Sequence, residues 1–467
     1  MNKTKKLIKN IITFAIGNIG SKLVLFFMVP LYTKCLSTDQ YGTIEIIETI
    51  EQLLIPFMSI VVFDAVIRFG LSKYEQRENV LKCALFVVLL GSIITILTTP
   101  LIGLYPSVYE WRWYISIYVI LNMFNSVLLN YVKVENKNIL YALISIFQTL
   151  ILALSNIIFL LIKDLGIKGY MCSIFASLLI ANILCIIFGN IISEFKRGKL
   201  EKVLLKQMLI YSAPLIINNI SWWIIHSSDK LMLELMISTE AVGIYAISAK
   251  IPSLINAITS IFQSAWSISS VNEIENDNES SFYSQTLLWL MTLIFGGTIC
   301  IIFILKPFMR IYVSYDFSDS WKYVPTLMIA ACSGSISSFY GCINSALKKN
   351  LYNMYTTLIG AIINIVLNYF FISLFGIMGA AIATTFSYFT IAITRMIICK
   401  KHLKFNMYFL LFFLNEINVI MLAIAIYFNV NIYFASIASF VIFIMINFQA
   451  IISLIRIIKQ HLYKNTI

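Results

Sequence analysis

The sequence predicts an all-α polytopic membrane protein of about 14 transmembrane helices: two parallel six-helix bundles around a central cavity, plus two extra C-terminal helices. Three observations predict this fold. Hydrophobic residues make up 60% of the 467 residues and charged residues only 12%, whereas an ordinary soluble domain has about 25% charged residues. Apolar runs recur along the whole chain, and short motifs of the first half return in the second. A soluble enzyme, a secreted disulfide scaffold and a disordered regulator are thereby excluded.

The expected spans follow one another with short connections. In chain order they are 11–33, 44–67, 80–104, 113–132, 139–162, 167–191, 209–236, 244–268, 284–305, 324–346, 351–373, 377–399, 405–428 and 433–455. The longest connections, near 192–208 and 269–283, hold only about 15 residues. A membrane enzyme such as a polysaccharide polymerase would need a substantial external loop, so it is the least favoured alternative and no catalytic residue is expected.

Basic residues orient the chain, which has 34 Lys and Arg against 22 Asp and Glu. With the N-terminus inside, 24 basic residues, Arg395 among them, fall in cytoplasmic segments and 7 in external ones. Cytoplasmic loops of membrane proteins carry such an excess. The expected location is therefore the bacterial cytoplasmic (plasma) membrane, multi-pass, with both termini cytoplasmic. The lipid bilayer explains the net charge of +12, and no nucleic-acid partner is expected.

The two halves of the chain repeat each other. Ser37–Gly42 matches Ser238–Gly243 at an offset of 201, and Gly166–Gly169 matches Gly376–Gly379 at an offset of 210. The common order predicts an internal duplication with a six-helix lobe at 1–200 and another at 201–404, followed by two additional helices and a cytoplasmic tail at 405–467. Because six helices return the chain to the same side, the repeats are parallel, as in alternating-access transporters.

The most informative residues are the lysines within apolar spans and the polar residues at helical spacing near them. A charge at the bilayer centre costs at least about 2.5–3.5 kcal/mol, so such residues face a protein interior or a watery cavity. Glu45, Glu48 and Glu51 share one face of a helix by their spacing of three. The expected cavity cations that bind substrate are Lys22, Lys230 and Lys250. The expected gating, ion-pair or coupling residues are Asp229, Glu234, His226 and Glu48, and the expected polar cavity residues are Asn18, Asn219, Tyr245, Asn256 and Gln263.

Each residue also has a local interpretation. Lys230 and Glu234 could form an ion pair within their own helix, Lys22 and Lys250 could snorkel, and the polar stripes could join helices. Lysines in a cavity attract an anion, and a phosphate-bearing substrate with sugar rings fits them together with the aromatic and hydroxyl side chains. No cofactor or metal is expected, because the eight cysteines form no C-x-x-C pair and the chain has three histidines; H⁺ or Na⁺ remains open as a coupling ion.

Two sets of motifs resemble those of a known family. The first is Pro30–Thr33 with Leu36–Thr38 and Tyr41-Gly42; the second is Tyr211–Pro214, Ser228–Lys230, Gly243–Tyr245 and Lys250–Pro252. Both are similar to segments of bacterial oligosaccharide (Wzx-type O-antigen and capsule repeat-unit) flippases, in the multidrug/oligosaccharidyl-lipid/polysaccharide exporter superfamily. That family often has Arg where this chain has Lys230, which keeps the charge but loses the bidentate fork.

The resemblance implies a function and partners. An undecaprenyl-diphosphate-linked oligosaccharide would cross from the cytoplasmic to the outer leaflet by alternating access, for surface polysaccharide synthesis. The partners would be this lipid-linked oligosaccharide, the lipid bilayer, and a polysaccharide polymerase and glycosyltransferases. Two alternatives stay open, a cation-coupled multidrug exporter of the same superfamily and a lipid II (peptidoglycan precursor) flippase.

Overall fold

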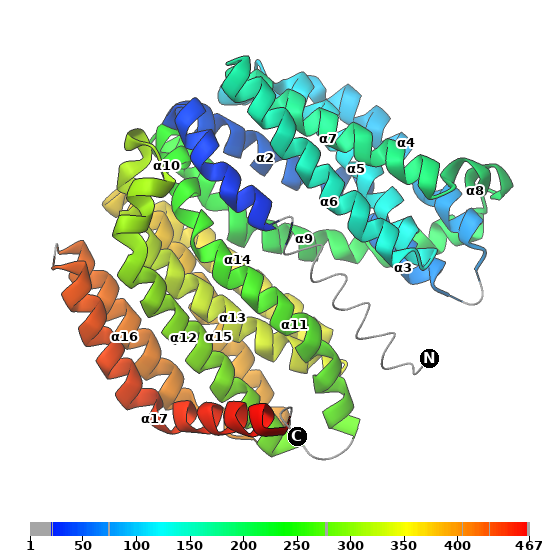
Figure 1. The fold of residues 1–467 in the computed structure, drawn as a ribbon. Helices are drawn as coiled ribbons and strands as arrows, with labels where there is room; N and C mark the ends of the chain where they lie inside the picture. Colours follow the sequence, from blue (N-terminus) through cyan, green and yellow to red (C-terminus); the bar gives the residue numbers. More distant parts are fainter. Residues whose placement is uncertain are drawn as a thin grey trace. The chain divides into compact units, whose positions relative to one another are not determined.

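A computed structural model describes residues 20, 22–72, 75–275, 279–403, 405–428 and 430–464. Its contacts divide the chain into two compact units, Met1–Gly243 and Ile244–Ile467, here called the N-terminal and C-terminal units. Each is built from helices, and no strand occurs in the described ranges (Figure 1). The all-α membrane fold expected from the sequence is confirmed.

The N-terminal unit contains eight labelled α-helices, with short 3₁₀ and π segments between them. In order they are α2 (Thr38–Ser59), α3 (Val62–Gly70), α4 (Arg77–Ile102), η1 (Pro106–Val108), α5 (Arg112–Val134), α6 (Asn138–Asn156), η2 (Ile157–Ile162), α7 (Gly166–Phe188), α8 (Ile191–Arg197) and α9 (Lys202–Met236). Helix α2 packs on α9, α5 and α4, so it lies inside this unit.

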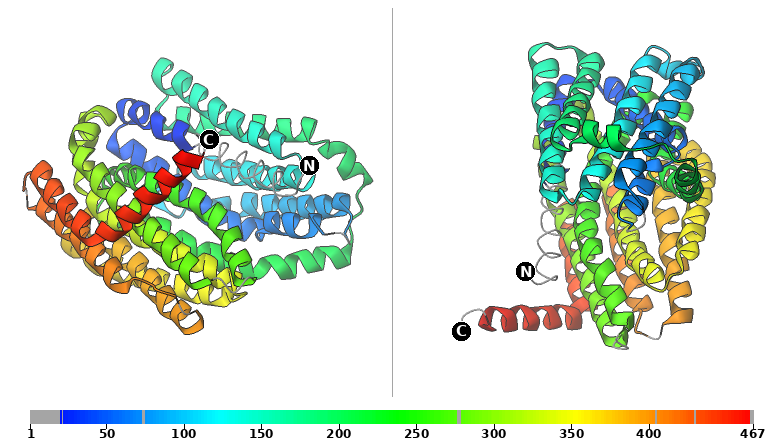
Figure 2. Two further views of the ribbon diagram at one scale, coloured as in Figure 1. Left: turned by 60° about the horizontal axis from the view of Figure 1, so that its bottom comes forward. Right: turned by 90° about the vertical axis from the view of Figure 1, so that its right-hand side faces the viewer.

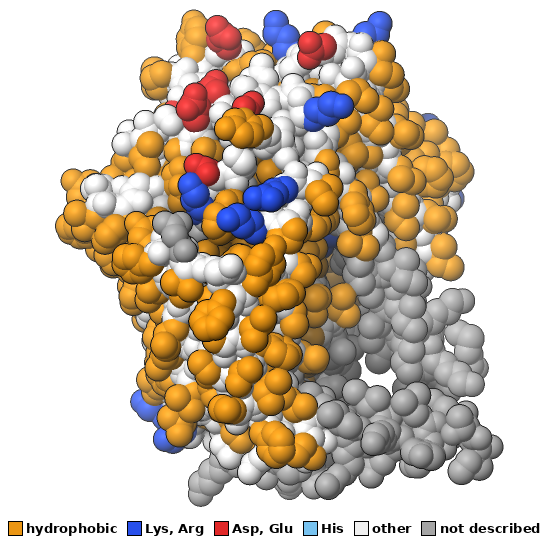
Figure 3. Space-filling view, turned by 60° about the vertical axis from the view of Figure 1, so that its left-hand side comes forward, with side chains coloured by type: hydrophobic (Ala, Val, Ile, Leu, Met, Phe, Trp, Pro, Cys, Tyr) orange, Lys and Arg blue, Asp and Glu red, His pale blue; other side chains and the backbone are white. Residues whose placement is uncertain are grey.

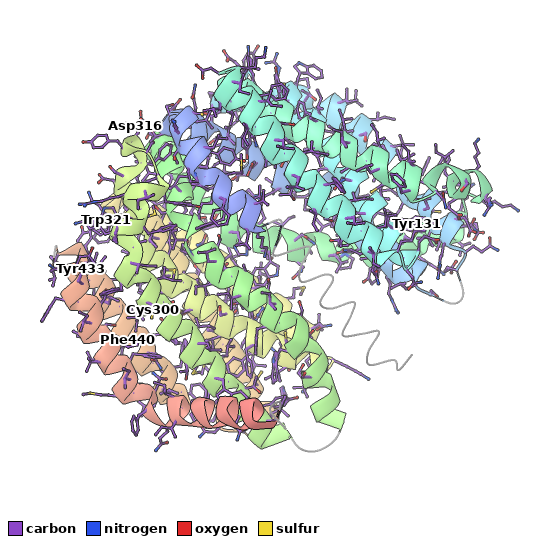
Figure 4. The ribbon with its side chains drawn as sticks, viewed as in Figure 1. Tyr131, Cys300, Asp316, Trp321, Tyr433 and Phe440 are labelled. Carbon is purple, nitrogen blue, oxygen red and sulfur yellow. The ribbon has the colours of Figure 1, made fainter. Side chains whose placement is uncertain are left out.

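The boundary between the units falls inside α10 (Thr239–Lys250). The C-terminal unit continues with α11 (Pro252–Glu275), α12 (Glu279–Tyr312), η3 (Tyr315–Lys322), α13 (Val324–Ala346), α14 (Asn350–Phe375), α15 (Ile377–His402), α16 (Phe409–Tyr427) and α17 (Ile432–Lys464). Among the described spans, helix α13 is the most extensively buried, because α15, α11, α12 and α16 pack around it (Figure 2). Figure 4 locates Cys300 of α12 and Tyr433 and Phe440 of α17 in this unit.

Eleven described helices are long and apolar enough to cross a membrane, and two bent pairs, α2 with α3 and α10 with α11, raise the number to 13. These helices correspond to the expected spans from 44–67 to 433–455. The first expected span, 11–33, lies in part outside the described residues, although residues 22–35 are helical. On the face drawn in Figure 3, hydrophobic side chains cover a broad surface, and charged side chains lie mainly over its upper part with a few at its lower left edge. A broad apolar surface is what contact with a bilayer requires.

Both bent pairs have local causes. Helix α2 ends at Ile60 and Val61, which both have a left-handed φ of 52°, and α3 leaves at 53°. Helix α10 meets α11 at 45°, where Pro252 removes a backbone donor. The two pairs also start alike, because Ser37 accepts a bond from the Gln40 amide and Ser238 from the Ala241 amide.

Helix α9 packs on α2, α3 and α4 and therefore belongs to the N-terminal unit by contact, although it follows residue 200 in the repeat. The units are defined by contacts, whereas the expected lobes at 1–200, 201–404 and 405–467 are defined by the internal repeat. The lobes therefore stay a prediction.

Candidate functional site

A row of carboxylates lies in the N-terminal unit. Glu45, Glu48 and Glu51 are spaced by three residues, so α2 presents them along one face. Glu45 and Glu51 are only 3% and 1% exposed, and Glu48 is half-buried. Acids buried within an apolar helix need partners, because neither lipid nor packed protein solvates a charge.

Each carboxylate receives a donor from a different helix. Lys230 of α9 lies 2.7 Å from Glu45 as an ion pair. Tyr170 of α7 donates its hydroxyl to Glu48 at 2.8 Å. Asn122 of α5 donates its side-chain amide to Glu51 at 2.5 Å. The row therefore connects α2 with three neighbouring helices through three kinds of donor.

Two aromatic contacts shape the α9 side of the row. The Trp223 indole donates to the backbone oxygen of Thr49 at 2.8 Å, which ties α9 to α2 between Glu48 and Glu51. Trp222 stacks on His226, with ring centroids 5.6 Å apart. The Trp223 bond holds α9 in register with α2, two turns along α9 from the point where Lys230 approaches Glu45.

Glu234 has partners other than Lys230. It accepts hydrogen bonds from the hydroxyls of Tyr105 and Ser107, both in the segment around η1. The alternative of an ion pair within α9 is therefore wrong, because Lys230 contacts Glu45 of α2 instead. Asp229, next to Lys230, is buried with 1% exposure.

The other expected site residues are more widely spread. Lys22 is exposed on its helix, and Asn18 lies outside the described residues. Asn219 donates to the backbone oxygen of Leu215 in its own helix at 2.9 Å. His226 is exposed despite its ring contact. Its role in gating or coupling, like that of Asp229 and Glu234, remains a prediction.

The remaining candidates lie in the C-terminal unit. Lys250 is half-buried at the end of α10, and Tyr245 is buried with its hydroxyl 3.4 Å from that of Thr384. On α11, Asn256 is exposed and Gln263 is half-buried. Of the three expected cavity lysines, the structure thus places Lys22 and Lys230 in one unit and Lys250 in the other.

Arg395 is buried inside the C-terminal unit, which its sequence context does not indicate. It is expected in a cytoplasmic segment, and it lies within α15 with only 3% exposure; its side of the membrane stays a prediction. Its guanidinium donates to the hydroxyls of Thr356 and Thr357 and to the backbone oxygen of Ser337, each at 3.0 Å. Lys400 and Lys401 follow Arg395 closely, so the three look like one basic run at the end of the span. Arg395 nevertheless lies more than one helical turn further into the apolar span.

Two further residues, Tyr170 and Glu416, are not singled out from the sequence. Asn122 is noticeable there, because it forms a polar stripe with Ser126 and Asn130 that fits a cavity or a helix contact equally well. Tyr170 and Asn122 become partners of the row only through packing. Glu416 carries a recognisable signal: it is the single charged residue in the helix Phe409–Tyr427, and it is 1% exposed. Within the described ranges, no group of three His, Cys, Asp or Glu residues is placed to hold a metal ion.

Comparisons with solved structures agree with the all-helical membrane fold. Two solved structures share the fold at 14% sequence identity, a level that carries the fold alone. The lipid II flippase MurJ, in an inward closed conformation, has a TM-score of 0.69 and matches 97% of this chain and 99% of that chain. An inward-facing multidrug resistance MATE family transporter of the MOP superfamily has a TM-score of 0.68 and matches 82% of this chain and 96% of that chain.

Sequence relatives extend the comparison. An uncharacterized membrane protein of Methanocaldococcus jannaschii is 24% identical over an alignment of 421 residues, and the match covers 85% of this chain and 99% of the relative. Residues 214–370 match the MatE family. Residues 7–268, more than half of the chain, match the family described as polysaccharide biosynthesis protein. The chain belongs to the polysaccharide biosynthesis protein family and is a membrane flippase or transporter of the multidrug/oligosaccharidyl-lipid/polysaccharide exporter superfamily.

Proposed function

We propose that this protein flips an undecaprenyl-diphosphate-linked oligosaccharide repeat unit from the cytoplasmic to the outer leaflet, for capsule, O-antigen or other surface polysaccharide. The family match over residues 7–268 supports a role in polysaccharide biosynthesis. The many apolar helices support a substrate that is moved across a bilayer. The membrane is then the bacterial cytoplasmic membrane, with both termini in the cytoplasm.

The observation that carries the proposal is the Lys230–Glu45 ion pair. The lysine and glutamate side chains are 16% and 4% exposed, so the lysine keeps slight access to the surface while the acid does not. A buried pair is costly to desolvate and is weak evidence for stability alone. A cation held this way can exchange its internal carboxylate for a substrate diphosphate, which offers similar charge-assisted hydrogen bonds.

This exchange suggests a transport cycle. In the substrate-free state, Glu45 neutralises Lys230. When the diphosphate arrives, Lys230 binds it, and Glu45 is left to take up a proton or another cation. Release on the other side restores the pair.

Other residues would bind the diphosphate and the sugars of the substrate. Lys22 and Lys250 would supply further positive charge for the diphosphate, while the isoprenoid tail stays in the bilayer. A polymerase and glycosyltransferases would consume and supply the substrate. Hydrogen bonds to the sugars would come from the polar set Asn18, Asn219, Tyr245, Asn256 and Gln263.

Surface polysaccharide in a strain that lacks the gene tests the proposal. The wild-type gene should restore the polysaccharide, Lys230→Ala should lose most of it at matched protein level, and Lys230→Arg should retain it because the charge persists. Lys206→Ala is the matched control, since Lys206 is an exposed lysine on the same helix. Full retention by Lys230→Ala would contradict the role of this cation.

A lipid II flippase is the second candidate, favoured by the fold match to such a protein across 97% of this chain. Proteoliposomes separate the two. With fluorescent lipid II and a fluorescent undecaprenyl-diphosphate oligosaccharide offered in parallel, the proposal expects transfer of the oligosaccharide to exceed that of lipid II. If lipid II moves faster than the oligosaccharide, the protein is better described as a lipid II flippase. Transfer of neither, with extrusion of cationic drugs, would indicate the multidrug exporter.

A further inference from the structure

Basic side chains from two connections meet at one end of the C-terminal unit. Lys348 and Lys349 lie in the turn between α13 and α14, and His402 is the last residue of α15. The Lys349 Nζ lies 3.0 Å from Nδ1 and 3.1 Å from Nε2 of His402. The His402 ring also stacks on Tyr352, with ring centroids 5.8 Å apart. Lys348 and His402 are exposed and Lys349 is half-buried, so this basic cluster of three residues is open to a ligand.

The helices that form the basic cluster contain no acid. The chain has no Asp or Glu between Asp319 and Glu416, a stretch that includes all of α13, α14 and α15. The acids of the C-terminal unit belong to other segments, at 273–279, 316–319 and 416. In the part of the chain that the structure describes, no ion pair involves a member of the cluster. Cations gathered in this way attract an anion.

The internal repeat supplies a comparison for this turn. An equivalent turn joins α5 to α6 at an offset of 212, where Asn136 corresponds to Lys348 and has a left-handed φ of 58° against 60°. The amides of Lys137 and Lys349 both donate to the carbonyl five residues earlier. Both turns therefore end their helix in a Schellman motif, in which Asn fits the left-handed position better than Lys does. The two repeats share this backbone and differ in side chains.

The side chains around the two turns give the lysines different partners. Lys137 donates to the backbone oxygen of Gly189, just past the end of α7, at 3.4 Å, and Glu135 supplies an acid in the same turn. In the second repeat Leu347 replaces that acid, and Lys349 meets a histidine in place of a carbonyl. The dipole of a helix favours a cation near its C-terminus in both repeats. It does not explain why the second turn alone gathers bases without an acid.

An exposed apolar stripe continues from the basic cluster along α14. Leu351, Tyr355, Leu358 and Ile362 are all exposed, and their spacing of four, three and four residues places them on one face. In a membrane span such a face contacts hydrocarbon, and tyrosine near the end of a span is typical of the headgroup level. A soluble anion would use the cluster alone. A phospholipid would use both the cluster and the stripe.

We propose that this end of α14 binds an anionic phospholipid, with its phosphate between Lys349 and His402 and an acyl chain along the exposed stripe. Lys348 supplies further positive charge at the headgroup. The site lies wholly in the C-terminal unit and uses neither Lys230 nor Glu45. It is therefore independent of the proposed flippase activity, because the lipid binds from the surrounding leaflet and its binding does not require transport.

Photolabelling of the full chain in phosphatidylcholine nanodiscs tests the proposal. Two probes carry the same diazirine acyl chain, one on phosphatidylglycerol and the other on phosphatidylcholine, and mass spectrometry of the labelled peptides locates the adducts. The phosphatidylglycerol probe should label α14 at least about fivefold more than the phosphatidylcholine probe, since one lysine near a membrane surface contributes about a factor of five. Equal labelling of α14 by the two probes would overturn the proposal, and this comparison needs no variant to fold.

Two variants separate this site from the net charge of the protein. Lys349→Ala should lower labelling of α14 by the phosphatidylglycerol probe about fivefold and leave labelling by the other probe unchanged. Lys137→Ala is the matched control, because it removes the same charge from the equivalent turn of the first repeat, and it should leave labelling of α14 unchanged. An equal loss in both variants, in monodisperse protein, would show that only net charge matters and would overturn the proposal.

A competition experiment separates a lipid from a soluble anion. Inorganic phosphate should displace the phosphatidylglycerol probe from α14 no better than chloride does at the same ionic strength, because the acyl chain holds the lipid at the stripe. Displacement by phosphate but not by chloride would reassign the basic cluster to a soluble phosphate and overturn the lipid assignment.

Discussion

Gly42 of α2 and Gly243 of α10 lie against each other where the two helices cross. A Cβ on Gly42 would overlap the backbone oxygen of Thr239 and lie 3.1 Å from the Gly243 nitrogen; a Cβ on Gly243 would overlap the backbone oxygen of Thr38 and lie 3.2 Å from the Gly42 nitrogen. Thr38 and Thr239 are themselves separated by 201 residues, as are the two glycines. The contact is thus nearly symmetric about the internal repeat, and each glycine permits close approach by the partner helix.

Alanine at either glycine should push α2 and α10 apart where they cross. In both positions the overlapping atom is a backbone oxygen, which cannot rotate away, so we expect Gly42→Ala and Gly243→Ala each to cost about 1–3 kcal/mol. Thermal unfolding of purified protein should show a lowered Tm for both. Gly297→Ala is the control, since a Cβ there meets no atom within 4 Å. An unchanged Tm in both crossing variants would show that the helices separate at no cost.

The Lys230–Glu45 pair should show strong coupling. Lys230→Met leaves a buried acid without its cation, which typically costs about 3–5 kcal/mol, whereas the double variant Lys230→Met with Glu45→Gln removes both charges and should recover much of that loss. A double-mutant cycle on the unfolding free energy measures the interaction. If the two single effects add to within about 0.5 kcal/mol, the pair is not coupled.

The other two carboxylates should differ in their sensitivity to loss of a donor. Asn122→Ala removes a hydrogen bond from Glu51, which is 1% exposed, and should cost about 1.5–3 kcal/mol. Tyr170→Phe removes the bond to Glu48, which is half-buried and can be solvated in part, so its cost should be smaller. Denaturant unfolding in detergent gives both values. A larger cost for Tyr170→Phe than for Asn122→Ala would contradict this prediction. It would mean that Glu48 depends on its donor more than Glu51 does.

Arg395 should be replaceable by neither methionine nor lysine. Its guanidinium reaches three acceptors at 3.0 Å in different directions, a fork that a single ammonium cannot reproduce. We expect Arg395→Lys to lower the Tm clearly and Arg395→Met to lower it further. Lys401→Met, at an exposed lysine near the end of the same helix, is the control. A lysine variant with wild-type stability would show that only the charge of Arg395 matters.

Composition and periodicity alone determine much of this protein. An apolar run of about 20 residues has few alternatives to a transmembrane helix, because the bilayer forces every backbone group to be satisfied within the segment. The helical spans past residue 36 are therefore predictable from the apolar runs. The repeat likewise places Gly42 and Gly243 at equivalent positions, and the spacing of Glu45, Glu48 and Glu51 predicts their common face.

The partners of those residues are decided only by the tertiary structure. Helical spacing places Lys230 and Glu234 on one stripe, but a lysine side chain is long and flexible, and Glu45, 185 residues away in sequence, lies 2.7 Å from its Nζ once α9 packs on α2. Arg395 is buried because α13, α14 and α15 enclose it, although the basic residues that follow it are typical of a loop. Spacing along one helix determines which side chains share a face. Which side chain from another helix meets that face depends on how the helices pack, and for Lys230, Arg395 and Gly42 that packing produces the contacts described above.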